Sequence, residues 1–199
     1  MKTLALLGTV TGIALFAGIR LYATVLTVGL CLRYGLLHLP QELASLSVLA
    51  HPYVLGAAGV CAIMEFVADK VPWVDSLWDA VHAFLRPAGA ALIAFAAVGR
   101  LDPAAEIAVI LLCGGVAFSS HSAKAGTRLL VNQSPEPFSN ILLSLFEDVV
   151  AVGGSYAAVA HPLAILAVVA AFLCLFTLLA QRIYRRLRRD PARPRNSGS

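Results

Sequence analysis

The feature that most constrains this chain is a series of seven apolar runs, separated by glycine, proline and isolated charges. Hydrophobic residues make up 59% of the 199-residue sequence, and charged residues only 13%. A soluble domain usually has about 25% charged residues, so the surplus apolar surface must face lipid. The runs lie at residues 3–18, 21–37, 52–68, 87–99, 104–119, 138–160 and 162–181.

These runs predict an all-α, polytopic membrane protein of about six to seven helical spans, since a bilayer core takes about 20 apolar residues per helix. We expect residues 1–189 to form a single transmembrane domain and residues 190–199 a disordered tail. The runs on either side of Arg20 and the run 87–99 are short, which predicts broken or re-entrant helices. Proline suits the first turn of a helix, so we expect helices to begin at Pro52, Pro87, Pro103 and Pro162.

A weak internal similarity raises the hypothesis of two inverted repeats, over residues 1–100 and 104–189. The segment that contains Arg20 matches the segment that contains Arg128, in the order Gly-x-Arg-Leu, and an acidic segment and a proline-led run follow each. The segment before Pro52 matches the one before Pro162 equally well in another register, so the repeat stays a hypothesis.

The first polar constellation covers residues 65–87. Glu65 and Asp69 are four residues apart on one helix face at the end of an apolar run, and an ionised carboxylate in hydrocarbon is costly enough to need a partner or a function. Four further polar residues share one face of the next helix: Asp75, Asp79, His82 and Arg86. This face indicates either a pore-facing or ligand-facing helix or an amphipathic helix at the membrane surface. A metal site at Asp75, Asp79 and His82 is a further hypothesis.

The second constellation covers residues 119–148. Small hydroxyl residues and cations near a helix break can bind an anion, although a polar cytoplasmic loop explains the same pattern. Glu147 and Asp148 lie within an apolar run and must face protein or water rather than lipid; they could also be charge partners of Arg128 or Arg20. The predicted substrate-binding residues are Arg20, Lys124, Arg128, Ser120, His121, Asn132 and Asn140. The predicted proton or coupling residues are Glu65, Asp69, Glu147 and Asp148.

The segments ADKVPWVDSLWDAVHAFLRP, GIRLY and AKAGTRLLVNQSPEPFSN, followed by LSLFEDV, resemble an uncharacterised bacterial integral-membrane family known only as a domain of unknown function. The resemblance covers nearly the whole chain and implies no known activity. A basic run follows the last apolar run, which predicts a multi-pass protein of the bacterial inner membrane with a cytoplasmic C-terminus. The side of the N-terminus is open, because one re-entrant hairpin would reverse it.

The favoured function is a small transporter or channel for a polar or anionic solute, coupled to protons or cations through the intramembrane carboxylates. Alternatives are a flippase or binding protein for a phosphorylated lipid, a membrane-embedded enzyme and a structural subunit. No catalytic signature is present, so an enzyme is not expected, nor is a cofactor. The expected partners are the lipid bilayer, a small solute or lipid head group, and a second copy of the chain in a homodimer. Nucleic acid is not expected, because the topology rule explains the basic run.

Overall fold

The computed structural model describes residues 2–99, 101–131 and 137–189, and the regular structure there is entirely helical. The predicted all-α class is therefore confirmed. The tail at 190–199 and Asn132 lie outside the described residues. The elements are α1 (Lys2–Ile19), α2 (Leu21–Arg33), the 3₁₀ segment η1 (Gln41–Ala50), α3 (Pro52–Ala68), α4 (Pro72–Val98), α5 (Pro103–Val131), α6 (Pro137–Ala160) and α7 (Pro162–Arg189).

Five of these helices, α1, α4, α5, α6 and α7, are long and apolar enough to cross a membrane. The pair η1 and α3 also qualifies when taken together, with a bend of 63°. The described residues thus give five spans, or six with the bent pair, fewer than the seven at the upper end of the prediction. Large apolar side chains point outward from these helices, such as Phe84 (80% exposed), Leu111 (70%) and Val149 (70%). This exposed apolar surface is what a bilayer solvates, and the chain is a polytopic helical membrane protein.

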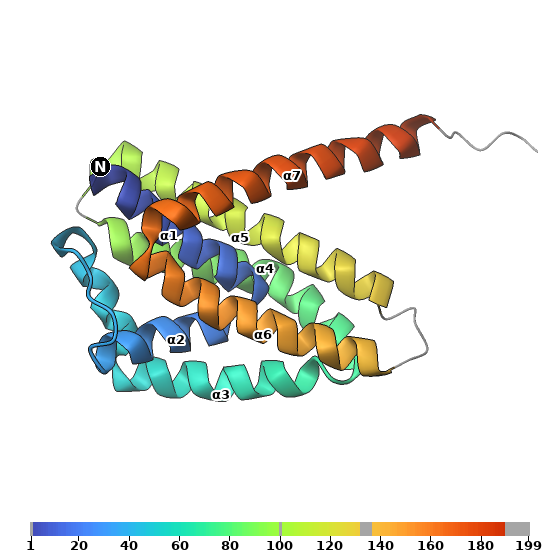
Figure 1. The fold of residues 1–199 in the computed structure, drawn as a ribbon, viewed down its shortest axis with the longest axis horizontal. Helices are drawn as coiled ribbons and strands as arrows, with labels where there is room; N and C mark the ends of the chain where they lie inside the picture. Colours follow the sequence, from blue (N-terminus) through green and yellow to red (C-terminus); the bar gives the residue numbers. More distant parts are fainter. Residues whose placement is uncertain (1, 100, 132–136, 190–199) are drawn as a thin grey trace, which may run out of the picture.

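The first helix, α1, runs through the middle of the bundle and packs against α4, α5, α6 and α7 (Figure 1). Small residues allow this central position. A Cβ added at Gly18 would lie 1.8 Å from Ser120 Oγ and 2.3 Å from the Ala117 carbonyl oxygen, both on α5. Only glycine permits that approach, as is common where membrane helices pack closely. Two residues later, the extended backbone of Arg20 separates α1 from α2, so the predicted break at this position is present.

Three of the four predicted helix starts are correct, and one is wrong. Pro52, Pro103 and Pro162 stand at the first residues of α3, α5 and α7. Pro87, in contrast, lies inside α4, which continues for 27 residues, about 40 Å. Membrane helices tolerate an internal proline because neighbouring groups can satisfy the carbonyl that it frees. The run 87–99 is therefore not a short span but the second half of a long one.

The two ends of the bundle differ in character. At one end, Lys2 forms an exposed ion pair with Glu42 of η1, at 3.2 Å. The other end is formed by the turn between α3 and α4, the last turns of α5 and the first turns of α6, and the α1–α2 break lies deeper in the bundle, beside Ala117 and Ser120 of α5 (Figure 1). We call this second end the network end, because the buried charges gather there.

Candidate functional site

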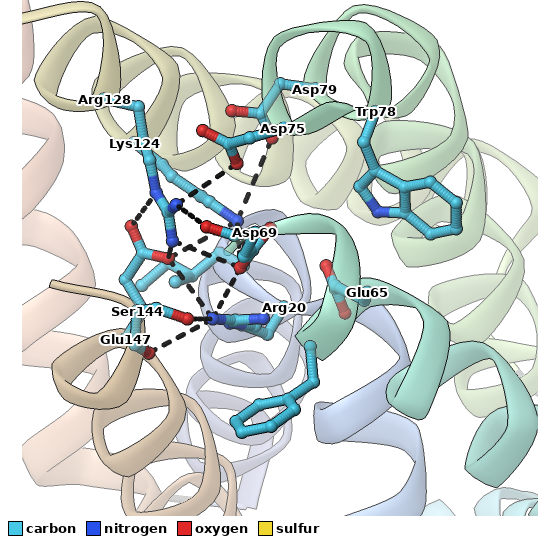
Figure 2. Close-up of polar contacts among 12 residues, drawn as sticks. Arg20, Glu65, Asp69, Asp75, Trp78, Asp79, Lys124, Arg128, Ser144 and Glu147 are labelled. Atoms are coloured by element: carbon cyan, nitrogen blue, oxygen red, sulfur yellow. Dashed lines mark hydrogen bonds and ion pairs between the residues drawn. The ribbon is translucent and has the colours of Figure 1, made fainter. Parts of the chain in front are cut away.

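A network of buried ion pairs joins the α1–α2 break, α3, α4, α5 and α6 at the network end (Figure 2). Each of its members is charged, and each is remote in sequence from most of its partners. The cations are Arg20, Arg86, Lys124 and Arg128, all 6% exposed or less. The carboxylates are Glu65, Asp69, Asp75, Asp79, Glu147 and Asp148.

At the centre of this charge network, two carboxylate oxygens share the same three cations. Asp69 Oδ2 lies 2.6 Å from Arg20 Nη2, 3.1 Å from Arg128 Nη2 and 3.8 Å from Lys124 Nζ. Glu147 Oε2 lies 3.6, 2.6 and 3.5 Å from the same three nitrogens. Asp69 comes from the turn after α3 and Glu147 from α6, so the three cations hold separate elements together.

Arg128 makes the most contacts. Its guanidinium donates two hydrogen bonds to Glu147, from Nε to Oε1 at 3.1 Å and from Nη2 to Oε2 at 2.6 Å. Nη1 donates to Asp75 Oδ1 at 3.2 Å, to Asn140 Oδ1 at 3.1 Å and to the Asp69 carbonyl oxygen at 3.2 Å. Bidentate pairing of this kind fixes both the orientation of the two side chains and the distance between them. Arg128 thereby ties the end of α5 to α6 and to the α3–α4 turn.

Arg86 organises the neighbouring part of the charge network. It pairs with Glu65 at 2.7 Å and with Asp79 at 3.4 Å, and Nη1 lies 2.7 Å from His121 Nδ1. An arginine can only donate, so Nδ1 of His121 accepts, and Nε2–H donates to the Asp79 carbonyl oxygen at 3.1 Å. These two partners fix His121 as a neutral imidazole. Lys124, 3.9 Å from Asp79, connects this part to the centre.

The amphipathic face predicted for residues 75–86 points into the protein. Asp75 and Arg86 are fully buried, and Asp79 and His82 are 7% and 2% exposed. The helix is the first half of the α4 span, so the alternative of a surface helix is wrong, and Arg86 lies within a span rather than on a cytoplasmic flank. A metal site finds no support, since the described residues contain no group of three His, Cys, Asp or Glu side chains suited to holding an ion.

Not every predicted residue joins the charge network, and some of the neutral side chains that contact the predicted residues were not predicted. The Ser120 hydroxyl donates to the carbonyl oxygens of Leu15 and Ala117, which fastens α5 to α1. Ser144 Oγ accepts from Arg20 at 2.9 Å, and nothing in its apolar sequence surroundings marked it. Tyr22 and Trp78 hold His82 through a hydrogen bond and ring stacking, and only the three-dimensional fold brings Tyr22 to it.

The charge balance is not neutral. Four buried cations face six carboxylates, which leaves the network with more acid than base. In addition, Glu65 Oε2, Asp69 Oδ1 and Arg86 Nε are buried without a hydrogen-bond partner among the described residues. Buried polar atoms are normally satisfied by protein or water, and here the two carboxylate oxygens lack a donor and the arginine nitrogen lacks an acceptor among the described residues.

Asp69 lies just outside the spans, and its pKa reflects its surroundings. Burial by itself would raise the pKa of this carboxyl, but the positive charges of Lys124, Arg20 and Arg128 prevail and hold it below the usual value. The lowered pKa favours the ionised form of Asp69, which pairs with all three cations.

Two cavities reach the charge network from opposite sides of α5. A groove of about 450 Å³ between α4 and α5 is lined by Asp75, Asp79, His121 and Arg128, among others. A second cavity of about 360 Å³, which we call the crevice, lies between α1, α5, α6 and α7. Its charged residues are Lys124 and Glu147. Members of the charge network therefore line both cavities.

An apolar helical bundle with a buried network of long-range ion pairs between two cavities defines a class: a polytopic membrane protein with an internal polar site. The particular family follows from its sequence model, which is described as "Domain of unknown function (DUF4126)" and matches residues 7–182. The chain belongs to this family, which confirms the resemblance seen in the sequence. Comparison with curated proteins and with solved structures finds no match.

Proposed function

We propose that this protein is a proton-coupled transporter for a small anionic solute, placed in a bacterial inner membrane with its C-terminus in the cytoplasm. One observation carries the proposal: Arg20, Lys124 and Arg128 each contact both Asp69 Oδ2 and Glu147 Oε2. Three cations around two acid oxygens form the ligand set of an anion site, which in this state the protein's own carboxylates occupy. A solute anion competes for the place of one of them.

Glu147 is the carboxylate that the solute anion replaces. Its side chain is 8% exposed and lines the crevice, whereas that of Asp69 is fully buried. The cations also keep Asp69 ionised. In addition, α6 packs mainly on α1 and α2 and makes little contact with α5, so the Arg128–Glu147 pair is a principal tie between α5 and α6.

Protonation of Glu147 explains how proton and solute are coupled. A neutral carboxyl no longer pairs with Arg128 and Lys124 at this position, and a buried charge that loses a partner is strongly unfavourable. A solute anion that takes the vacated position pairs with these two cations again, so one proton and one negative charge enter the site together. When the proton leaves, the Glu147 carboxylate displaces the anion. The same weak contact between α5 and α6 lets these helices separate during the exchange.

The distribution of basic residues supports the orientation. At the network end, Lys70 follows α3, and exposed arginines such as Arg182 and Arg186 occupy the C-terminal half of α7. The opposite end of the described chain has fewer basic residues, among them Lys2 and Arg33. Cytoplasmic flanks are enriched in Lys and Arg, which favours a cytoplasmic network end.

Proteoliposomes that contain a trapped pH-sensitive dye test the proposal. We expect inward proton movement when inorganic phosphate, sulfate or a short carboxylate is added outside, because the anion enters with a proton. Glu147→Gln should abolish this movement while still exchanging labelled anion for anion, since glutamine imitates the protonated carboxyl. Glu106→Gln, at the far end of the same α5 helix, is the matched control and should behave as wild type.

Two outcomes contradict the proposal. One is the absence of proton movement with every anion in wild-type vesicles. The other is normal proton movement in Glu147→Gln, which would place the coupling elsewhere. In the first case the ion pairs would serve only to fix the helices in register.

A further inference from the structure

The crevice differs from the α4–α5 groove both in its charge and in the polarity of its wall. The groove presents two carboxylates, Asp75 and Asp79, beside Arg128, so it repels an anion. The crevice presents only Lys124 and Glu147 as charged groups, and they lie together at one place. Once Glu147 is protonated, as the proposed function requires, the charge there is positive.

The rest of the crevice is apolar. Its wall is formed by side chains that include Leu15 and Phe16 of α1, Phe146 of α6, and Val168 and Phe172 of α7. Two hydroxyl groups also line it, but both are already used: Ser120 donates to the Leu15 carbonyl oxygen, and Thr127 donates to that of Ala123. A ligand that fills this cavity thus contacts one charged position and an otherwise apolar wall.

The position of the crevice relates it to the bilayer. All four helices that form it, α1, α5, α6 and α7, are candidate spans, and Phe146 at its wall is 65% exposed. Lys124 lies seven residues before the end of α5 at Val131, about 10 Å along the helix axis. That depth suits the boundary between head groups and acyl chains, with the apolar wall extending from there toward the middle of the membrane.

From this match of charge and depth we infer that the crevice is the entry site for an anionic amphiphile: a phosphate or carboxylate head with a single apolar chain, taken laterally from the lipid. The head meets Lys124 and then the centre of the charge network, and the chain lies against α1 and α7. The inference rests on the proposed function and narrows its solute from small anions in general to membrane-partitioned ones. A water-soluble anion has no apolar part that would pack against this wall.

Two alanines on α5 provide a matched pair of blocking variants. Ala123 lines the crevice and Ala125 lines the α4–α5 groove, so a tryptophan at each position fills one cavity and leaves the other open. Leu143→Trp fills the crevice from α6 and serves as an independent second block. Correct folding of each variant is checked by its helical circular dichroism and its elution from size exclusion.

The experiment measures binding to the purified full-length protein in detergent micelles, with dodecyl phosphate and inorganic phosphate as probes. We expect dodecyl phosphate to bind, and to bind at least about tenfold more weakly, a change of about 1.4 kcal/mol, in Ala123→Trp and Leu143→Trp. Ala125→Trp should leave its affinity unchanged, and inorganic phosphate should bind more weakly than the amphiphile.

The outcomes separate this inference from the proposed function. If inorganic phosphate binds as tightly as dodecyl phosphate, or if only Ala125→Trp weakens the binding, the solute comes from water through the groove, and the inference is wrong while coupled transport survives. If neither probe binds at any pH, and Glu147→Gln does not restore binding, both proposals are wrong. Binding of dodecyl phosphate that no blocking variant weakens also overturns the inference.

Discussion

The Arg128–Glu147 pair should be one of the strongest couplings in the protein, and a double-mutant cycle measures it. The perturbation is Arg128→Met, Glu147→Met and the two together. Each single change leaves a buried charge with fewer partners, and breaking a buried ion pair costs about 3–5 kcal/mol. After Arg128→Met, for example, Glu147 Oε2 keeps only Lys124 at 3.5 Å and Arg20 at 3.6 Å.

The size of the coupling follows from the geometry of the pair. The two charge-assisted hydrogen bonds, at 3.1 and 2.6 Å, are each worth about 1.5–3 kcal/mol in a protein. We therefore expect the double mutant to lose about 3 kcal/mol less free energy of unfolding than the two single mutants lose together. Ordinary hydrogen bonds between membrane helices couple by only about 0.6 kcal/mol, with a maximum near 1.7, so the expected value lies clearly above that range.

The assay is reversible unfolding in mixed micelles of detergent and sodium dodecyl sulfate, followed by far-UV circular dichroism, which reports helix content. The control cycle is Lys2→Met with Glu42→Gln, a pair whose side chains are 89% and 41% exposed, and no measurable coupling is expected there. A coupling for Arg128 and Glu147 no larger than the ordinary value of about 0.6 kcal/mol would refute the argument that this pair is a principal tie between α5 and α6.

Two further predictions concern acid stability and packing. The pKa of Asp69 is lowered in the folded protein, so its contribution to stability is present above its unfolded pKa of about 3.9 and is lost as the pH falls through the lower folded value. Unfolding titrations should accordingly show that Asp69→Asn lowers stability at neutral pH and flattens the loss in acid; an unchanged acid profile contradicts this. Gly18→Leu should prevent stable folding, because a Cβ alone would lie 1.8 Å from Ser120 Oγ. Gly56→Ala, where a Cβ meets nothing within 4 Å, should be neutral or stabilising by up to about 1 kcal/mol, and equal thermal stability of the two glycine variants would contradict the packing.

The sequence predicted the class of fold because the physics involved is local. Apolar content and proline placement depend on neighbouring residues only, which is why the starts at Pro52, Pro103 and Pro162 are correct. Pro87 is an exception to the rule that proline begins a helix. Whether a proline begins a helix or lies within one depends on which group satisfies the carbonyl that the proline leaves without a partner. That information is tertiary.

The free-energy cost of a charge in lipid predicted which residues belong to the charge network. It predicted less well which residues they pair with. A charge inside an apolar run is unfavourable in lipid, which singled out Arg20, Glu147 and Asp148 and suggested that they pair. The sharing of three cations by Asp69 and Glu147 needs the α1–α2 break, the α3–α4 turn and α6 to meet. No pattern within a single segment encodes that meeting. Ser144 shows the limit most plainly, because a lone serine in a helix carries no signal until Arg20 is beside it.

Both proposals depend on the exchange of a protein carboxylate for a solute anion, and the most direct test counts protons during that exchange. The measurement is proton uptake when dodecyl phosphate binds to the full-length protein in weakly buffered solution, followed with a pH indicator. The account predicts about one proton taken up per anion bound, beyond any change in the ligand itself, and no uptake in Glu147→Gln. Binding by the wild-type protein without proton uptake would contradict it.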